Sequence, residues 1–398
     1  MAQRRKYVTV CQQTENGFFS ILRFENNMKF FHPLALTCLL TSSLLLVTSC
    51  ALLPSQAKPN LTTAQTAAYN YLKQLVSPTE GIGAREAGTK KEKETAHYIK
   101  ANFEKFGYRV TEQGFSYNSR KMVGDSQNII AELGDSTKPT IILGAHYDST
   151  AMKTGSMGAT DNGAGVAAML AIAEALVDKM PENYNIRFIA FGAEEIGLQG
   201  SNYYVTNLLE NKKLNNIAAM INFDTIAGGD KVYVHSAHST PYKRCKSEKY
   251  SSEASIRNAL LTASIKVLGE NNKYVIHPDY EGYPEGVTGS WSDHASFACA
   301  GIPIAYVEST NFAINGQNGF DGYSQSTTAE LWTCYDQKNV TACDKKAEKN
   351  WGNIWHTQYD NLDKLNEIFP GRVEKQLGDN VEVLIEYLSN PELYLNSK

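Results

Sequence analysis

The sequence has little cysteine, no excess of charge of one sign and no apolar run long enough to span a membrane. Its 398 residues include seven Cys, too few for a fold built on disulfides. The 38 Lys and Arg against 42 Asp and Glu give no basic surface for nucleic acid. A mean hydropathy of −0.36 excludes a multi-pass membrane protein. What remains is a large soluble globular protein, a class in which enzymes are common.

A short apolar run near the N-terminus is typical of an export signal. No charged residue occurs between Lys29 and Lys58, and Leu34–Val47 forms an apolar stretch of 14 residues. A membrane-spanning helix needs about 20 apolar residues, so this length predicts the core of a signal peptide. Met28 stands shortly before it, which predicts that translation starts there and not at Met1.

The apolar run ends in Val47-Thr-Ser-Cys50, which resembles a bacterial lipobox. Cys50 would then become a lipidated N-terminal residue, residues 1–49 would be the signal peptide, and residues 50–60 would form a tether. Ordinary signal cleavage nearby and an uncleaved anchor are the alternatives. We therefore expect export from a bacterium, to the periplasm, to the outer membrane as a lipoprotein, or by secretion.

Apolar strands alternate with amphipathic helices in the rest of the chain. This alternation predicts an α/β fold, a three-layer α/β/α sandwich with a mixed, mainly parallel central sheet. The expected helices are Leu61–Val76, Lys90–Phe106, Asp161–Met180, Ser252–Leu268 and Arg372–Leu388. The expected strands are Tyr108–Ser116, Asn128–Leu133, Thr140–Ala145, Ile186–Phe191, Ile217–Phe223 and Ile302–Val307.

Polar side chains follow four of these strands at their carboxyl ends, where open α/β sheets hold their ligands. These residues are His146 and Asp148, Glu194 and Glu195, Asp224, and Glu308. Histidine with carboxylates and no cysteine suits Zn²⁺ or another divalent metal. Each residue alone has an ordinary explanation as a turn acid or a local hydrogen-bonded pair. Two adjacent carboxylates at a buried strand end repel each other, however, and a metal ion removes that cost.

Six short motifs along the chain make the hypothesis more specific. They are His146-Tyr-Asp148, Asp161-Asn-Gly-Ala-Gly165, Phe191-Gly-Ala-Glu194-Glu195-Ile-Gly-Leu-Gln-Gly-Ser201, Asn222-Phe-Asp224, Ser292-Asp-His294 and His356-Thr-X-X-Asp360. In this order they resemble the co-catalytic di-zinc aminopeptidases, metallopeptidase family 28, from about Gly81 to about Leu388. The resemblance implies the zinc-exopeptidase fold, with one catalytic domain over residues 61–398.

The resemblance implies two Zn²⁺ ions per chain, held by five ligands. Asp161 would bridge the ions, His146 and Asp224 would complete one site, and Glu195 and His356 would complete the other. Two such ions lower the pKa of a bridging water and polarise a peptide carbonyl. The implied enzyme is a metallo-aminopeptidase that removes N-terminal residues from peptides or proteins by means of a metal-bridged hydroxide.

Roles for other residues come from the same resemblance. Glu194 would be the general base, and Asp148 would orient His146. Asp293 and His294 lie in a stretch that is near the site in this family, so they are candidates for binding substrate. Asp360 would steady the loop of His356.

Two further segments resemble a branch of the family that removes basic N-terminal residues. They are Glu308-Ser-Thr-Asn311 and Asp321-Gly-Tyr323. Glu308 would receive the α-amine or a basic side chain, and Tyr323 is a further candidate. Many members steady the oxyanion with a Tyr, but here Trp355 precedes the His ligand, so that role stays unassigned.

Other functions on this fold remain as alternatives. A glutaminyl-peptide cyclotransferase uses one zinc, which the combination of His146 and Asp224 argues against. A carboxypeptidase relative needs an Arg for the substrate carboxylate, and neither Arg85 nor Arg187 follows a strand. A non-catalytic relative would lack ligands. We expect peptide N-termini as partners, no nucleic acid, a membrane only through an N-terminal lipid or signal anchor, and a monomer.

The cysteines that remain after export predict one disulfide. Cys334 and Cys343 lie in the irregular segment Phe312–Trp351 and are expected to pair in an oxidising compartment. Cys245 and Cys299 could also pair, but the sequence slightly favours two buried free thiols.

Overall fold

The computed structural model describes residues 7–13, 19–25, 62–119, 122–133, 137–246 and 249–395. Strand β1 (Tyr7–Gln13) pairs antiparallel with β2 (Phe19–Glu25), in a unit separate from the rest of the chain. The predicted start at Met28, the signal peptide core, the lipidation candidate Cys50 and the tether lie outside the described residues.

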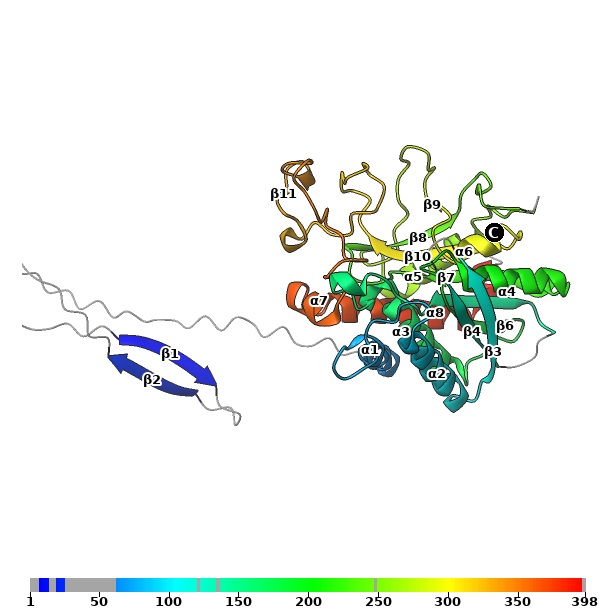
Figure 1. The fold of residues 1–398 in the computed structure, drawn as a ribbon, viewed down its shortest axis with the longest axis horizontal. Coiled ribbons are helices and arrows are strands. Elements are labelled where there is room, and N and C mark those ends of the chain that lie inside the picture. Colours follow the sequence, from blue (N-terminus) through cyan, green and yellow to red (C-terminus); the bar gives the residue numbers. More distant parts are fainter. Residues whose placement is uncertain are drawn as a thin grey trace, which may run out of the picture. The chain divides into compact units, whose positions relative to one another are not determined.

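One sheet of eight strands organises the second unit, in the order β3-β4-β6-β5-β7-β10-β8-β9 (Figure 1). The strands are β3 (Arg109–Asn118), β4 (Val123–Leu133), β5 (Thr140–His146), β6 (Asn185–Phe191), β7 (Ile217–Phe223), β8 (Lys231–Ala237), β9 (Val287–Thr288) and β10 (Ile304–Thr310). Strands β6, β5, β7 and β10 run parallel, as do β8 and β9. The pairs β3–β4, β4–β6 and β8–β10 are antiparallel. The predicted mixed, mainly parallel sheet is confirmed.

Helices cover both faces of the sheet and complete the predicted sandwich (Figure 1). One face packs against α1 (Thr63–Val76), α2 (Lys90–Lys105), α3 (Ala164–Leu176), α5 (Ser255–Leu268) and α8 (Arg372–Ser389), and the other against α4 (Gln199–Glu210) and α6 (His294–Ala298). Successive residues of a strand point to opposite faces. Accordingly, Ile141 and Leu143 of β5 join the first core, and Ile142 joins the second.

Two short helices, α7 (Leu362–Ile368) and α9 (Pro391–Leu395), and the small hairpin β11 (Tyr335–Asp336) and β12 (Thr341–Ala342) complete the fold. None of the described helices combines the length and apolar composition that a membrane span requires.

The start of α3 differs from the sequence prediction. Asp161 was expected to open this helix, but the helix begins at Ala164. Asp161 instead has a non-helical backbone, with φ −115° and ψ 89°, in the turn Ala159–Gly163. This turn leaves its carboxylate free to meet residues from the sheet edge.

Two disulfides are present in the described chain. Cys334 and Cys343 are joined, as their spacing predicted. Cys245 and Cys299 are also joined, so the preference for free thiols was wrong. Their Cα atoms lie 5.0 Å apart because the loop of Cys245 crosses the C-terminal end of α6, a proximity that sequence separation hides.

Candidate metal centre

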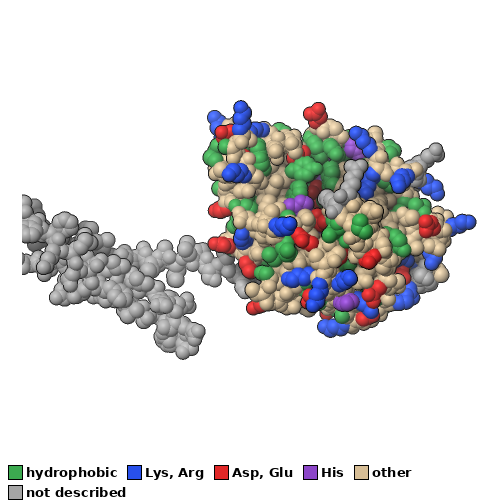
Figure 2. All heavy atoms as spheres, viewed as in Figure 1, with side chains coloured by type: hydrophobic (Ala, Val, Ile, Leu, Met, Phe, Trp, Pro, Cys, Tyr) green, Lys and Arg blue, Asp and Glu red, His purple; other side chains and the backbone are tan. Residues whose placement is uncertain are grey.

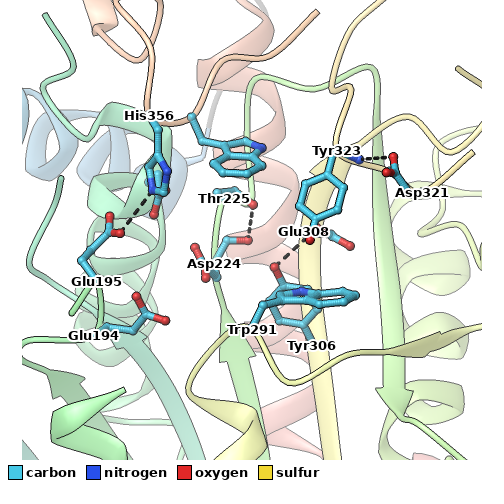
Figure 3. Close-up of a pocket in the computed structure, with 13 residues that line it drawn as sticks. Glu194, Glu195, Asp224, Thr225, Trp291, Tyr306, Glu308, Asp321, Tyr323 and His356 are labelled. Carbon is cyan, nitrogen blue, oxygen red and sulfur yellow. Dashed lines mark hydrogen bonds and ion pairs between the residues drawn. The ribbon is translucent and has the colours of Figure 1, made fainter. Parts of the chain in front are cut away.

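Neighbouring parallel strands bring the predicted residues to one edge of the sheet (Figure 3). His146 ends β5, Glu194 and Glu195 follow β6, and Asp224 follows β7. Between β6 and the two glutamates, Ala193 adopts a positive φ of 55°. This turn lets adjacent carboxylates face different parts of the site, as their separate roles require.

Asp161 joins two ligand triplets. Its Oδ1 lies 3.3 Å from Nε2 of His146, which is also 3.4 Å from Oδ1 of Asp224. Its Oδ2 lies 3.1 Å from Nε2 of His356, which is also 3.2 Å from Oε2 of Glu195. Each triplet has its ligand atoms within 4.8 Å of one another. The two oxygens of one carboxylate therefore belong to two adjacent groups of residues that could each hold a metal ion.

The donor set and its spacing fit zinc. Ligand atoms that surround one tetrahedral Zn²⁺ at about 2.0–2.1 Å lie about 3.3–3.4 Å from each other. The closest nitrogen–oxygen distances within the two triplets, 3.1–3.4 Å, agree with that spacing. Imidazole nitrogens with carboxylate oxygens are also the donors that zinc accepts when no thiolate is present.

The electrostatics of the pocket favour a bound cation. Burial and the carboxylate of Asp161 raise the pKa of Glu195 to about 7. Burial also raises the pKa of Asp224 and, well above its usual range, that of Glu194. Burial alone would lower the pKa of His356, but Asp161 and Glu195 outweigh it and raise that pKa to about 11. Zinc would displace these protons and neutralise the carboxylates.

Asp148 holds two parts of the site together. Its carboxylate accepts backbone N–H bonds from Glu194 at 2.9 Å and from Glu195 at 3.1 Å. Its Oδ1 lies 3.6 Å from Nδ1 of His146, and its backbone oxygen lies closer to that nitrogen, at 3.1 Å. Asp148 therefore orients the glutamate turn at least as directly as it orients His146.

Asp360 supports Asp161 more than the loop of His356. Its carboxylate accepts hydrogen bonds from the backbone N–H and the hydroxyl of Thr160, at 2.5 and 2.9 Å, and from the backbone N–H of Asp161 at 3.4 Å. Burial and the charge of Asp161 raise the pKa of Asp360 to about 7.

Arg85, named above only as a possible ligand for a substrate carboxylate, is fully buried near the site. Its guanidinium donates to the backbone oxygens of Tyr147, Met157 and Gly158 at 2.8–2.9 Å. These oxygens belong to the segments that carry His146 and Asp161. The only sequence signal was a lone Arg in a glycine-rich turn, Gly81–Gly88, far upstream of the motifs.

A cavity opens beside the ligands, with about 660 Å³ of space that includes open solvent at its mouth. Figure 2 shows a hollow on this face with red and purple side chains inside it and green side chains at its rim. Apart from the ligands and Glu194, the lining consists of Thr225, Trp291, Tyr306, Glu308, Asp321, Gly322, Tyr323 and Trp355. No Lys or Arg is among these described residues.

The four candidates for substrate binding separate into two groups. Glu308 and Tyr323 line the cavity, whereas Asp293 and His294 are completely buried and do not line it. His294 packs its ring against Tyr306 at 4.7 Å between centroids. Burial lowers the pKa of His294 to about 3, so it is held neutral. Its place is structural, behind the wall of the cavity.

Glu308 was expected to follow its strand, but it lies within β10. Its Oε1 lies 2.9 Å from Nε2 of His235, a buried residue of β8 for which the sequence showed no motif. The hydroxyl of Tyr306 donates to its other oxygen at 3.4 Å. The pair of β8 and β10 thus fixes one carboxylate at the far side of the cavity from Glu194 (Figure 3).

Known proteins share this sequence pattern and fold. The family model described as Peptidase family M28 matches residues 128–380. The alkaline phosphatase isozyme conversion protein of Escherichia coli is 28% identical over 323 residues, which cover 76% of this chain and 84% of that protein. Aminopeptidase YwaD of Bacillus subtilis is 44% identical over 104 residues, 25% of this chain and 22% of that protein.

Solved structures agree on the fold. A zinc aminopeptidase from Bacillus subtilis superposes with a TM-score of 0.56 at 20% identity, over 82% of this chain and 95% of that one. A glutaminyl cyclase from Porphyromonas gingivalis superposes with a TM-score of 0.56 at 21% identity, over 83% and 99%. The fold alone therefore does not distinguish a peptidase from a cyclase.

Proposed function

Because the chain belongs to peptidase family M28, we propose that it removes N-terminal residues from peptides with two zinc ions bound in the two triplets. The predicted class, a metallo-aminopeptidase, is confirmed by the family match and by relatives named aminopeptidases. The observation that carries the two-ion proposal is the carboxylate of Asp161, with one oxygen in each triplet. Such sharing has no use in a site for a single ion.

Bound zinc would polarise the peptide carbonyl and acidify the attacking water. Side chains of the protein supply the proton transfers. Glu194 belongs to neither triplet, and its buried carboxylate faces the cavity. A carboxyl with a raised pKa can take a proton from water and later give it to the leaving amine. The backbone N–H of Glu194 donates to the carboxylate of Asp148, which holds Glu194 in that position.

The acidic cavity favours substrates with a free α-amine. Its described lining contains carboxylates but no Lys or Arg, and Glu308 and Asp321 remain beyond the ligand set. An ammonium group is attracted there, whereas a C-terminal carboxylate is repelled. We propose that Glu308 receives either the α-amine or a basic N-terminal side chain, and that basic residues are preferred.

The alternative on this fold is a glutaminyl-peptide cyclotransferase, supported by the likeness to the Porphyromonas gingivalis enzyme. An enzyme with a single zinc ion needs only one triplet of ligands and has no need of another. The closeness of His146, Asp161 and Asp224 therefore favours the peptidase.

The test is zinc content together with hydrolysis of aminoacyl-nitroanilides that carry Lys, Arg, Leu or Glu. We expect two zinc ions per chain, release that stops with a chelator and returns with zinc, and faster release of Lys and Arg. N-acetylated versions should resist, because they lack the α-amine. One zinc per chain without chelator-sensitive release would contradict the proposal.

We also propose that the protein is exported and anchored through lipid on Cys50. The lipobox-like sequence Val47-Thr-Ser-Cys50 supports this proposal. The catalytic domain would then begin near residue 61, after the tether. Radiolabelled palmitate should label the protein expressed in bacteria, and Cys50→Ala should abolish the label. Labelling that persists in this variant would disprove the lipobox.

A further inference from the structure

A basic segment lies next to the acidic cavity. Lys243, Arg244 and Lys246 flank Cys245 in a chain whose formal net charge is −4. The cavity itself has no Lys or Arg in its described lining. Blue side chains appear at one side of the hollow in the space-filling view (Figure 2).

Three contacts fix this segment against the wall of the cavity. The disulfide joins Cys245 to Cys299 at the end of α6. The buried hydroxyl of Tyr242 donates to the backbone oxygen of Thr288 at 3.0 Å. Nη1 of Arg244 donates to the backbone oxygen of Ser290 at 3.2 Å. Ser290 directly precedes Trp291, which lines the cavity, so the guanidinium is anchored beside the cavity wall.

Arg244 and Lys246 also line a hollow of their own, between α4 and α6. Its other lining residues are Asn202, Val205, Thr206, Leu209, Ser296, Cys299 and Ala300. No carboxylate is among these described residues, and Arg244 forms no ion pair within the described part of the chain. Two cations with no carboxylate among these lining residues make the hollow complementary to an anion.

The two helices that border the hollow each follow a residue close to the metal centre. Helix α4 follows the turn of Glu194 and Glu195, and α6 follows Asp293. Burial lowers the pKa of Arg244, and the charges of Asp293 and Glu194 act against that lowering. Glu308 and Tyr323 lie on the opposite side of the cavity (Figure 3). The carboxylates whose charges act on Arg244 are thus Asp293 and Glu194, and Glu308 is not among them.

We propose that Arg244, with Lys246 beside it, binds a carboxylate on the leaving side of the scissile bond. The inference rests on the proposed function, in which Glu194 gives its proton to the leaving amine and the departing peptide therefore lies on that side. The carboxylate is either the C-terminus of a dipeptide or an acidic side chain of the second residue. A guanidinium can bind either one in a bidentate manner. The structure thus assigns short or acidic peptides as the substrate class.

The experiment compares matched peptides with the N-terminal residue that the nitroanilide panel finds best. One pair is the dipeptide Xaa-Ala and its C-terminal amide, and the other is Xaa-Glu-amide and Xaa-Gln-amide. We expect about a tenfold higher kcat/KM for the carboxylate member of at least one pair, mainly through KM, because a charge-assisted hydrogen bond is gained. High salt should reduce this ratio, because the group is partly exposed.

Arg244→Gln should bring that ratio close to one, and Arg244→Lys should retain part of it. Lys243→Gln is the matched control, an exposed cation of the same segment, and should keep the wild-type ratio. Calorimetric binding of the dipeptide and its amide to the zinc-loaded Glu194→Gln variant, in which hydrolysis is expected to be slow, gives the same comparison with little turnover. Equal ratios in both pairs for the wild type, or an undiminished ratio in Arg244→Gln, would overturn the inference.

The two proposals fail separately. If the nitroanilides are hydrolysed but neither peptide pair is discriminated, only the role of Arg244 is lost. If N-acetylated peptides are cleaved and Arg244→Gln abolishes that cleavage, Arg244 serves a carboxypeptidase, and the proposed aminopeptidase function is overturned.

Discussion

Replacing Glu194 with Gln is expected to leave both zinc ions bound and to lower kcat by about 10²- to 10⁴-fold. The side chain keeps its shape but can no longer accept a proton. The ligand triplets do not include Glu194, so metal binding should not depend on its charge. Its backbone hydrogen bond to Asp148 does not involve the side chain and should persist.

Zinc content by mass spectrometry and kcat on a nitroanilide measure this result. Glu210→Gln, an exposed acid at the end of α4, is the matched control and should behave as the wild type. Loss of zinc in Glu194→Gln would show that Glu194 and Glu195 have exchanged the roles assigned to them. Full activity with two zinc ions would remove Glu194 from the mechanism.

Asp161→Asn is expected to release both zinc ions and to abolish measurable hydrolysis. Burial would raise the pKa of Asp161, but His146 and His356 outweigh it and hold that pKa below the usual range. The residue is therefore an anion shared by both triplets. Its loss leaves one carboxylate in each triplet, Asp224 in one and Glu195 in the other, which weakens both sites at once.

Competition with a chromogenic chelator measures the zinc affinity of this variant. Asp224→Asn is the comparison, because it changes one triplet and should release one ion only. Circular dichroism of both metal-free variants controls for folding. If Asp161→Asn retained one tightly bound ion, the bridge would be disproved and the two sites would be independent.

Much of the fold could be predicted from local sequence. Strand Ile217–Phe223 has the predicted bounds, and Arg372–Leu388 matches α8 to within one residue. The strand is a short, almost continuous apolar run and the helix repeats its apolar residues about every 3.6 positions, so each signal is visible in one chain segment. Helix α4 was missed because its 12 residues include a Gly, a Ser, two Asn and two β-branched residues, which favour no helix by propensity.

Some residues of the candidate site could be identified from the sequence, and others could not. His146, Asp224 and the two glutamates could be identified because each follows an apolar strand. The burial of His294 and the pairing of Glu308 with His235 could not be, because both depend on how β8 packs against β10. The structural role of Arg85 could not be predicted, because its acceptors are backbone oxygens, which leave no trace in a sequence.

The sequence by itself determined the fold class, the kinds of metal donor and the family. It could do so because apolar periodicity and short motifs are local properties of the chain. Only the tertiary structure decided that Asp161 serves two triplets, that Cys245 pairs with Cys299 and that Arg244 lies beside the cavity. Such contacts join distant segments, as with His356 and Glu195, which are 161 positions apart. The order of strands and the path of loops bring these residues together, and neither is encoded in any one segment.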